Sequence, residues 1–268
     1  MRQLRFSSVF MLVFASLLAL GAHAEKITIA AAADLKFAMD ELVIEFRQAY
    51  PSDQIDVIYG SSGKFHTQIQ QGAPFDLYFS ADISYAQSLA DAGFAAGAVR
   101  PYAIGRLVLW SSQRDASQMT LADLTDPAIK RIAIANPKHA PYGMRAVEAL
   151  KQSGLWGKVE AKLVYGENIA QTAQFVQTGN AQVGIIALAL ALSPELSRQG
   201  GYWLIPQEWH EPLAQGFIIT KRAEQNALAK QFADYLGSKP ARAVMERFGF
   251  VLPGEAPAPV TKGAANAH

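Results

Sequence analysis

The chain has no cysteine, few histidines and almost no net charge. Its 268 residues include 5 histidines, 24 lysines and arginines, and 23 aspartates and glutamates, which gives a formal net charge of +1. The absence of cysteine excludes disulfides and thiol chemistry. A nucleic-acid-binding protein is usually strongly basic, so we expect no nucleic-acid partner. The histidines have no metal-ligand spacing, and neither a P-loop nor a G-x-G-x-x-G motif is present.

Long apolar runs are also absent, except at the N-terminus. Arg2 and Arg5 precede the apolar run 9–20, and the small residues "AHA" follow at 22–24. This order is typical of a secretory signal peptide, and the apolar run is short for a membrane span. We therefore expect residues 1–24 to be a signal peptide and the mature protein to be exported to a bacterial periplasm.

The rest of the chain has the composition of a folded protein, with 50% hydrophobic and 18% charged residues overall. The strand-like segment 26–32 is followed by segment 35–50, in which apolar residues recur at helical spacing. The same alternation continues to residue 93, and a second set of strands and helices starts at Arg106. Glycines that could end four of the helices are Gly72, Gly93, Gly154 and Gly179.

This order predicts an α/β fold with two lobes, each a mostly parallel sheet flanked by helices. A cleft between lobes is a usual place for a small ligand. A later strand at 216–220 and two further helices complete the pattern, and the segment from Pro253 onwards is rich in proline, alanine and glycine. We expect that segment, 253–268, to be a flexible tail.

Four junctions between a strand and the next helix could hold a ligand. They are 31–35, 59–64, 138–144 and 165–171. In open α/β sheets ligands bind at the carboxyl ends of strands, and the N–H groups at a helix N-terminus favour anions.

The polar residues at these junctions also have a purely structural interpretation. Asp34, Ser61, Ser62 and Asn168 are all good helix N-caps, and both interpretations stay open from the residues alone. A function of another class, a secreted hydrolase that uses Ser62 as nucleophile, is disfavoured because "GSSG" is not the G-x-S-x-G motif.

Three segments give the chain a family resemblance. "KITIAAAADLKFAMDEL", "YGSSGKFHTQIQQGAPFDLYFSAD" and "IANPKHAPYGMRAVEAL" resemble the periplasmic molybdate-binding protein of ABC transporters, and the similarity runs from about residue 26 to 252. The resemblance implies a two-lobed periplasmic-binding-protein fold of type II. It places one lobe at 25–103 plus 216–252 and the other at 104–215, with the ligand in the cleft between them.

The resemblance also implies a non-catalytic function. A protein of this family binds molybdate or tungstate and delivers it to the membrane permease of an ABC transporter. It needs no cofactor, and molybdenum is bound only as the oxyanion, through hydroxyl and main-chain N–H groups without a counter-charge. We expect a monomer. Another oxyanion, such as sulfate, is the alternative ligand within the same class.

Carried over by motif, the site residues are Asp34, Ser62, Tyr142, Ile169 and Ala187. Asp34 and Ala187 depart from the family pattern, in which Ser or Thr and Tyr are found, so they would contribute through the main chain if at all. We expect the Asp34 carboxylate to turn away from the anion and cap its own helix. Because Ala187 has no hydroxyl, the Tyr142 phenol would replace it.

Overall fold

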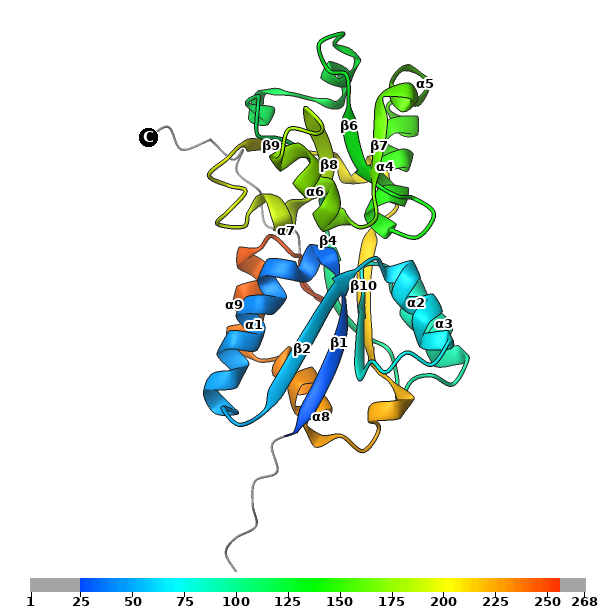
Figure 1. Cartoon of the computed structure of the whole chain (residues 1–268), viewed down its shortest axis with the longest axis vertical. Coiled ribbons are helices and arrows are strands. Elements are labelled where there is room, and N and C mark those ends of the chain that lie inside the picture. The colour runs from blue at the N-terminus through cyan, green and yellow to red at the C-terminus, as the bar shows by residue number, and fades with distance from the viewer. Residues whose placement is uncertain (1–24, 256–268) are drawn as a thin grey trace, which may run out of the picture.

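The structure, a computed structural model, describes residues 25–255, so the predicted signal peptide and most of the predicted tail lie outside the described residues. Two lobes are stacked along the long axis of the molecule (Figure 1). Each lobe contains a five-stranded sheet. None of the helices in residues 25–255 is long and apolar enough to cross a membrane.

The sheet of the first lobe has strand order β2-β1-β3-β10-β4, and helices cover both of its faces (Figure 1). Its strands are β1 (Lys26–Ala32), β2 (Gln54–Gly60), β3 (Leu77–Ser80), β4 (Arg100–Gly105) and β10 (Leu213–Ile219). Its helices are α1 (Lys36–Ala49), α2 (Ser62–Gln70), α3 (Ile83–Asp91), α8 (Ala227–Tyr235) and α9 (Lys239–Arg247). Buried side chains of α1, α8 and α9 form one core, and those of α2 and α3 form another.

The sheet of the second lobe has strand order β7-β6-β8-β5-β9. Its strands are β5 (Leu107–Ser111), β6 (Ile132–Ala135), β7 (Leu163–Gly166), β8 (Val183–Ala187) and β9 (Gly201–Leu204). Its helices are α4 (Pro141–Gln152), α5 (Trp156–Val159), α6 (Ile169–Gln177) and α7 (Leu188–Ala191). The predicted α/β fold with mostly parallel sheets is confirmed, and each sheet has one antiparallel strand, β10 in the first and β5 in the second.

Strands β4 and β10 carry the chain between the lobes. They pair antiparallel with each other in the first sheet, and β10 extends up to the second lobe (Figure 1). The predicted lobe boundaries at 103/104 and 215/216 fall inside these two strands. The pairing register shifts by one residue between Gln215 and Gly216, where Tyr102 of β4 has no partner residue.

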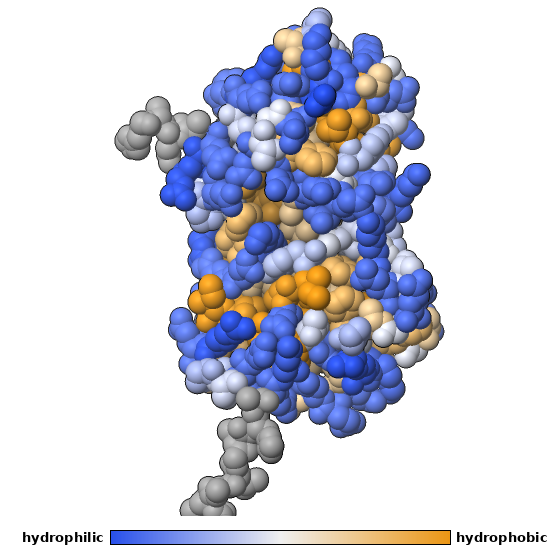
Figure 2. Space-filling model, in the orientation of Figure 1, coloured by the Kyte–Doolittle hydropathy of each residue, from blue (hydrophilic) through white to orange (hydrophobic). Residues whose placement is uncertain are grey.

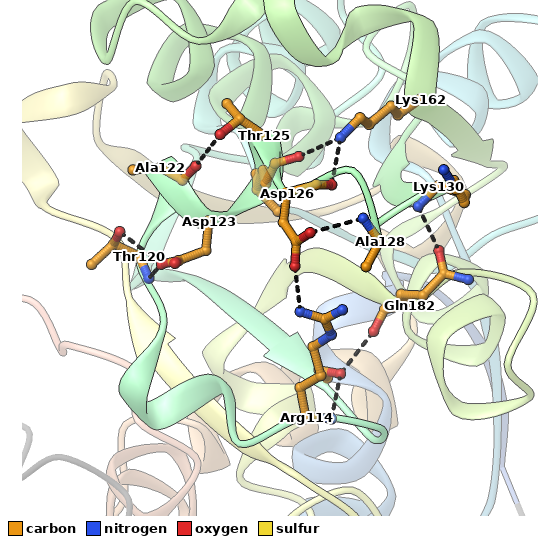
Figure 3. Close-up of polar contacts among 12 residues, drawn as sticks. Arg114, Thr120, Ala122, Asp123, Thr125, Asp126, Ala128, Lys130, Lys162 and Gln182 are labelled. Atoms are coloured by element: carbon orange, nitrogen blue, oxygen red, sulfur yellow. Dashed lines mark hydrogen bonds and ion pairs between the residues drawn. The ribbon is translucent and has the colours of Figure 1, made fainter.

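The long connection from β5 to β6 has only short 3-10 turns, and polar contacts hold it (Figure 3). The Asp126 carboxylate accepts a hydrogen bond from Arg114 Nη1 at 2.9 Å. Lys162 Nζ donates to the carbonyl oxygen of Asp126, also at 2.9 Å. The side-chain oxygen of Gln182 accepts the Lys130 N–H at 3.1 Å. Backbone groups in this loop therefore find partners without a strand or a long helix.

Hydrophilic residues cover most of the face in Figure 2, and apolar residues gather mainly around its middle. Within residues 25–255, the large apolar side chains that are exposed are Ile44 on α1, Ile58 on the edge strand β2 and Tyr165 on β7.

Candidate functional site

A small cavity lies where the two lobes meet. The first lobe contributes the end of β1, the 3-10 turn η1 (Ala33–Leu35), the start of α2 and Ala81, which follows β3. The second lobe contributes the starts of α4 and α6. The cavity volume is about 10 Å³, which is close to the space that one water molecule needs. A tetrahedral oxyanion is larger than one water molecule, so the groups that line the cavity would need to shift slightly to admit it.

Three helix N-termini meet at this cavity, those of α2, α4 and α6. The first N–H groups of a helix have no partner within it, and they carry partial positive charge. At α6, the Asn168 side chain accepts the Gln171 N–H at 2.9 Å, and Ile169 lines the cavity. Among residues 25–255, no lysine or arginine lines the cavity. An anion here would be balanced by dipoles rather than by a cation.

Ser62 has a hydroxyl that is suited to a ligand. The residue is fully buried at the start of α2, and its Oγ accepts the Ala81 N–H at 3.0 Å. The hydroxyl proton then stays available to donate. Its neighbour Ser61 is bonded instead to His139, with 2.8 Å between Oγ and Nδ1. Ser61 occupies the N-cap position of α2 but makes no side-chain cap bond, and Ser62 lies inside the helix. The capping interpretation is fully confirmed only for Asn168.

Asp34 does not cap a helix, and that prediction is wrong. It lies inside the turn η1, and the N-cap positions of η1 and α1 are Ala32 and Leu35, neither of which makes a side-chain cap bond. The Asp34 side chain instead joins the two lobes. Its Oδ2 accepts hydrogen bonds from Tyr142 Oη at 3.0 Å and from Gln215 Nε2 at 2.8 Å. The extra 3-10 turn places Asp34 within a helical turn, where its carboxyl reaches donors that are far away in sequence.

Burial dominates the electrostatics of this contact. Asp34 is 1% exposed, and removal from water raises the pKa of its carboxyl to about 6, although the hydrogen bonds from Gln215 and Tyr142 lower it. Burial and the nearby Asp34 carboxyl raise the pKa of Tyr142 well above its ordinary value. Tyr142 is therefore a neutral phenol, and its hydroxyl proton is donated to Asp34 rather than kept for an anion.

Two residues of this contact are absent from the predicted site. Gln215 is 1% exposed on β10, and its Nε2 also donates to Tyr142 Oη at 3.2 Å. Gly105 on β4 leaves the room that they need. A Cβ at position 105 would clash with the Tyr142 hydroxyl and would lie 2.6 Å from Gln215 Nε2. The signal in the sequence was the polar Gln215 directly before the apolar segment "GFII".

Four of the five predicted site residues line the cavity: Asp34, Ser62, Tyr142 and Ile169. Ala187 does not line it. Ala187 is fully buried at the end of β8, in the core of the second lobe, and it occupies the N-cap position of α7. The structure therefore brings together the loops of four junctions and leaves Ala187 outside them.

Further contacts between the lobes lie at the rim of the cleft. The Gly63 N–H donates to the His139 carbonyl at 2.9 Å. Lys64 pairs with Glu167, and Glu167 lies 3.9 Å from His139 Nε2. These groups do not support the hydrolase alternative, because the histidine contacts Ser61 rather than Ser62 and no hydrogen bond links it to the glutamate.

Comparisons with known proteins agree with this geometry. The family model described as bacterial extracellular solute-binding protein matches residues 27–251. The molybdate-binding protein ModA of Azotobacter vinelandii is 36% identical over 89% of this chain and 94% of its own length. The molybdate-binding protein ModA of Rhodobacter capsulatus is 35% identical over 87% of this chain and 91% of its own.

A solved structure extends the similarity to the fold. The periplasmic molybdate-binding protein of Azotobacter vinelandii superposes with a TM-score of 0.80 and 31% sequence identity, and the match covers 85% of this chain and 99% of that one. Proteins of the matched family bind solutes and are not enzymes. The chain therefore belongs to the bacterial extracellular solute-binding proteins, as a member of the molybdate-binding protein ModA family.

Proposed function

We propose that this protein binds molybdate, and tungstate with it, in the cleft between its lobes and delivers the anion to the membrane permease of an ABC transporter. The observation that carries the proposal is the meeting of three helix N-termini and the Ser62 hydroxyl at one cavity that no basic side chain lines. Relatives named as molybdate-binding proteins, matched over nearly their whole length, support the choice of ligand.

The proposed site residues are Ser62 through its hydroxyl and Ile169 through its main-chain N–H, with Asp34 and Tyr142 beside them. Donor-only groups suit a fully ionised tetrahedral oxyanion. Sulfate has the same charge and shape but shorter bonds, so the size of the closed cavity must separate the two. Sulfate is the alternative ligand for this reason.

The proposal includes how the protein works in the cell. Residues 1–24 direct export as a signal peptide, and the mature monomer captures the anion in the periplasm. The lobes, 25–103 plus 216–252 and 104–215, turn about strands β4 and β10 and close over the ligand. Closure agrees with the small cavity and with the many contacts across the cleft.

A thermal unfolding series tests this function. A ligand that binds only the folded protein raises the unfolding temperature by mass action. We expect a clear rise with molybdate and tungstate, and a much smaller one with sulfate and phosphate at equal concentration. An equal rise with sulfate would overturn the molybdate assignment. Small-angle scattering with and without molybdate tests closure, which predicts a more compact bound protein.

A further inference from the structure

The Asp34 carboxyl has one fully paired oxygen and one unpaired oxygen. The two side-chain donors, Tyr142 Oη and Gln215 Nε2, bond to Oδ2, and the backbone N–H groups of Asp34 and Leu35 lie close enough to the carboxyl to lower its pKa. Oδ1 is buried and has no hydrogen-bond partner in the part of the chain that the structure describes. Asp34 lines the cavity beside Ser62. A buried acceptor without a donor is costly, so the unpaired oxygen calls for an explanation.

No positive charge stands beside this carboxyl. Within residues 25–255, none of the ion pairs includes Asp34. The groups that face it are neutral: the Tyr142 phenol from α4, the Gln215 amide from β10 and the Tyr102 phenol from β4. An ionised Asp34 next to a bound dianion would add like-charge repulsion at low dielectric.

The hydrogen bonds to Oδ2 favour the carboxylate, whereas the buried, unpaired Oδ1 fits a carboxylic acid. In a protonated carboxyl one oxygen is an acceptor, and Oδ2 already accepts two hydrogen bonds. The other oxygen carries the proton and needs an acceptor. Oδ1 makes no hydrogen bond within residues 25–255, and the Gln215 Oε1 acceptor is also buried without a partner. An oxyanion in the cavity would be that acceptor, because it offers only lone pairs to the groups around it.

We propose that Asp34 binds the oxyanion in its protonated form and donates a hydrogen bond from Oδ1 to an oxygen of the ligand. This inference rests on the proposed function. It adds that the site accepts the ligand only when the Asp34 carboxyl is protonated. The only covalent bond that forms or breaks is the O–H bond of the Asp34 carboxyl. One proton from the solvent is taken up by the Asp34 carboxylate as the dianion binds, and it returns to the solvent when the dianion leaves.

The direction of the pH dependence follows from this proton. Burial raises the Asp34 pKa to about 6, so the free protein loses the proton as the pH rises above that value, whereas the bound protein keeps it. Molybdate affinity should therefore be highest below about pH 6 and should fall by up to about tenfold for each further pH unit. The loss stops where the bound carboxyl also ionises.

Calorimetric titration of the mature protein with sodium molybdate tests the proposal, at intervals from about pH 6 to about pH 8. Each titration is repeated in two buffers with different heats of ionisation, and the difference between the two binding heats gives the number of protons taken up. This measurement uses the unchanged protein. We expect about one proton per molybdate at the upper end of the range and an affinity about 10–100-fold lower there. Molybdate binding without proton uptake and without pH dependence would overturn the inference and leave the proposed function standing.

The isosteric variant Asp34→Asn sharpens the test, with Ser62→Ala as the matched control from the same cavity. The amide cannot ionise, so its molybdate affinity should be independent of pH and should exceed that of the unchanged protein at about pH 8 by about tenfold or more. Ser62→Ala should bind more weakly at every pH and keep the original pH slope. Weaker binding by Asp34→Asn at about pH 8, in a protein of unchanged unfolding temperature, would show that the ionised carboxylate is needed and would overturn the inference. Absence of molybdate binding by the unchanged protein at every pH would overturn the proposed function itself.

Discussion

Two sets of contacts join the lobes, and they differ in their surroundings. The buried contact consists of Asp34, Tyr142 and Gln215, which are at most 2% exposed. The rim contact consists of Lys64, His139 and Glu167, and the side chains of its ion pair Lys64–Glu167 are about half exposed. The buried contact has hydrogen bonds without a cation, whereas the rim has charges in water.

This difference separates two tasks. Charges at the rim are screened by water and salt, so they attract the lobes to each other only weakly and contribute little to the choice between ligands. Groups in the buried contact have no water to replace a lost partner, so each missing hydrogen bond is costly. In the proposed function, ligand selection is therefore assigned to the buried side of the cleft, together with Ser62.

The largest effect should come from Ser62→Ala. The variant loses a hydrogen bond to a charged ligand and leaves the buried Ala81 N–H without its acceptor. We expect molybdate binding to weaken by about 2–3 kcal/mol, measured by calorimetry. Ser88→Ala on α3, whose hydroxyl contacts His66 at the surface, is the matched control and should leave the molybdate affinity unchanged. Equal losses in the two variants would remove Ser62 from the site.

Tyr142→Phe should weaken molybdate binding by about 1 kcal/mol below about pH 6, because closure of the lobes no longer forms the hydrogen bond between Tyr142 and Asp34. The hydrogen bond from the Tyr142 phenol favours the ionised form of Asp34, so losing it should raise the Asp34 pKa further. The fall in molybdate affinity with rising pH should then begin at a higher pH than in the unchanged protein. Tyr235→Phe, which loses a hydrogen bond to Glu45 far from the cleft, should leave the pH profile as it was.

Gly105→Ala should crowd the buried contact from the side. The new Cβ would press on the Tyr142 hydroxyl and the Gln215 amide, and overpacking of this kind costs about 1–3 kcal/mol. We expect weaker molybdate binding and a lower unfolding temperature. Gly157→Ala is the control, since no atom lies within 4 Å of a Cβ at that position. An unchanged affinity in Gly105→Ala would mean that the contact tolerates a displacement of both side chains.

The smallest effect should come from the rim. Lys64→Ala breaks an exposed ion pair with Glu167, so its effect on molybdate affinity should be below about 1 kcal/mol and should vanish at high salt. Lys26→Ala, which breaks an exposed pair within the first lobe, is the control and should not change the affinity at all. A loss at Lys64 as large as at Ser62 would contradict the division between rim and buried side.

The sequence predicted the elements with clear local signals. The helices that were expected to end at Gly72, Gly93, Gly154 and Gly179 do so, and each of these glycines has a positive φ. Strands β4 and β9 were missed. β4 contains Pro101 and shows no regular alternation, and β9 is four residues long. Pairing with a distant strand, rather than a local pattern, makes these segments strands.

The site could be predicted only in part, for a similar reason. Ser62 and Ile169 line the cavity as the sequence predicted, because junctions and family motifs are local features. Asp34 was assigned to a helix cap because its neighbours in sequence favour one. Its true partners, Tyr142 and Gln215, are 108 and 181 residues away, and no periodicity reports such a distance.

The placement of Asp34 and Tyr142 on opposite lobes has a consequence for unloading. When a transporter pulls the lobes apart, Tyr142 leaves with the second lobe and water reaches the carboxyl. Hydration lowers the pKa of Asp34 towards its ordinary value, so above that value the proton that accompanied the anion is lost. The Asp34 carboxyl that bound the anion through a hydrogen bond is then negatively charged and repels it. Opening of the cleft would therefore itself promote release of the anion.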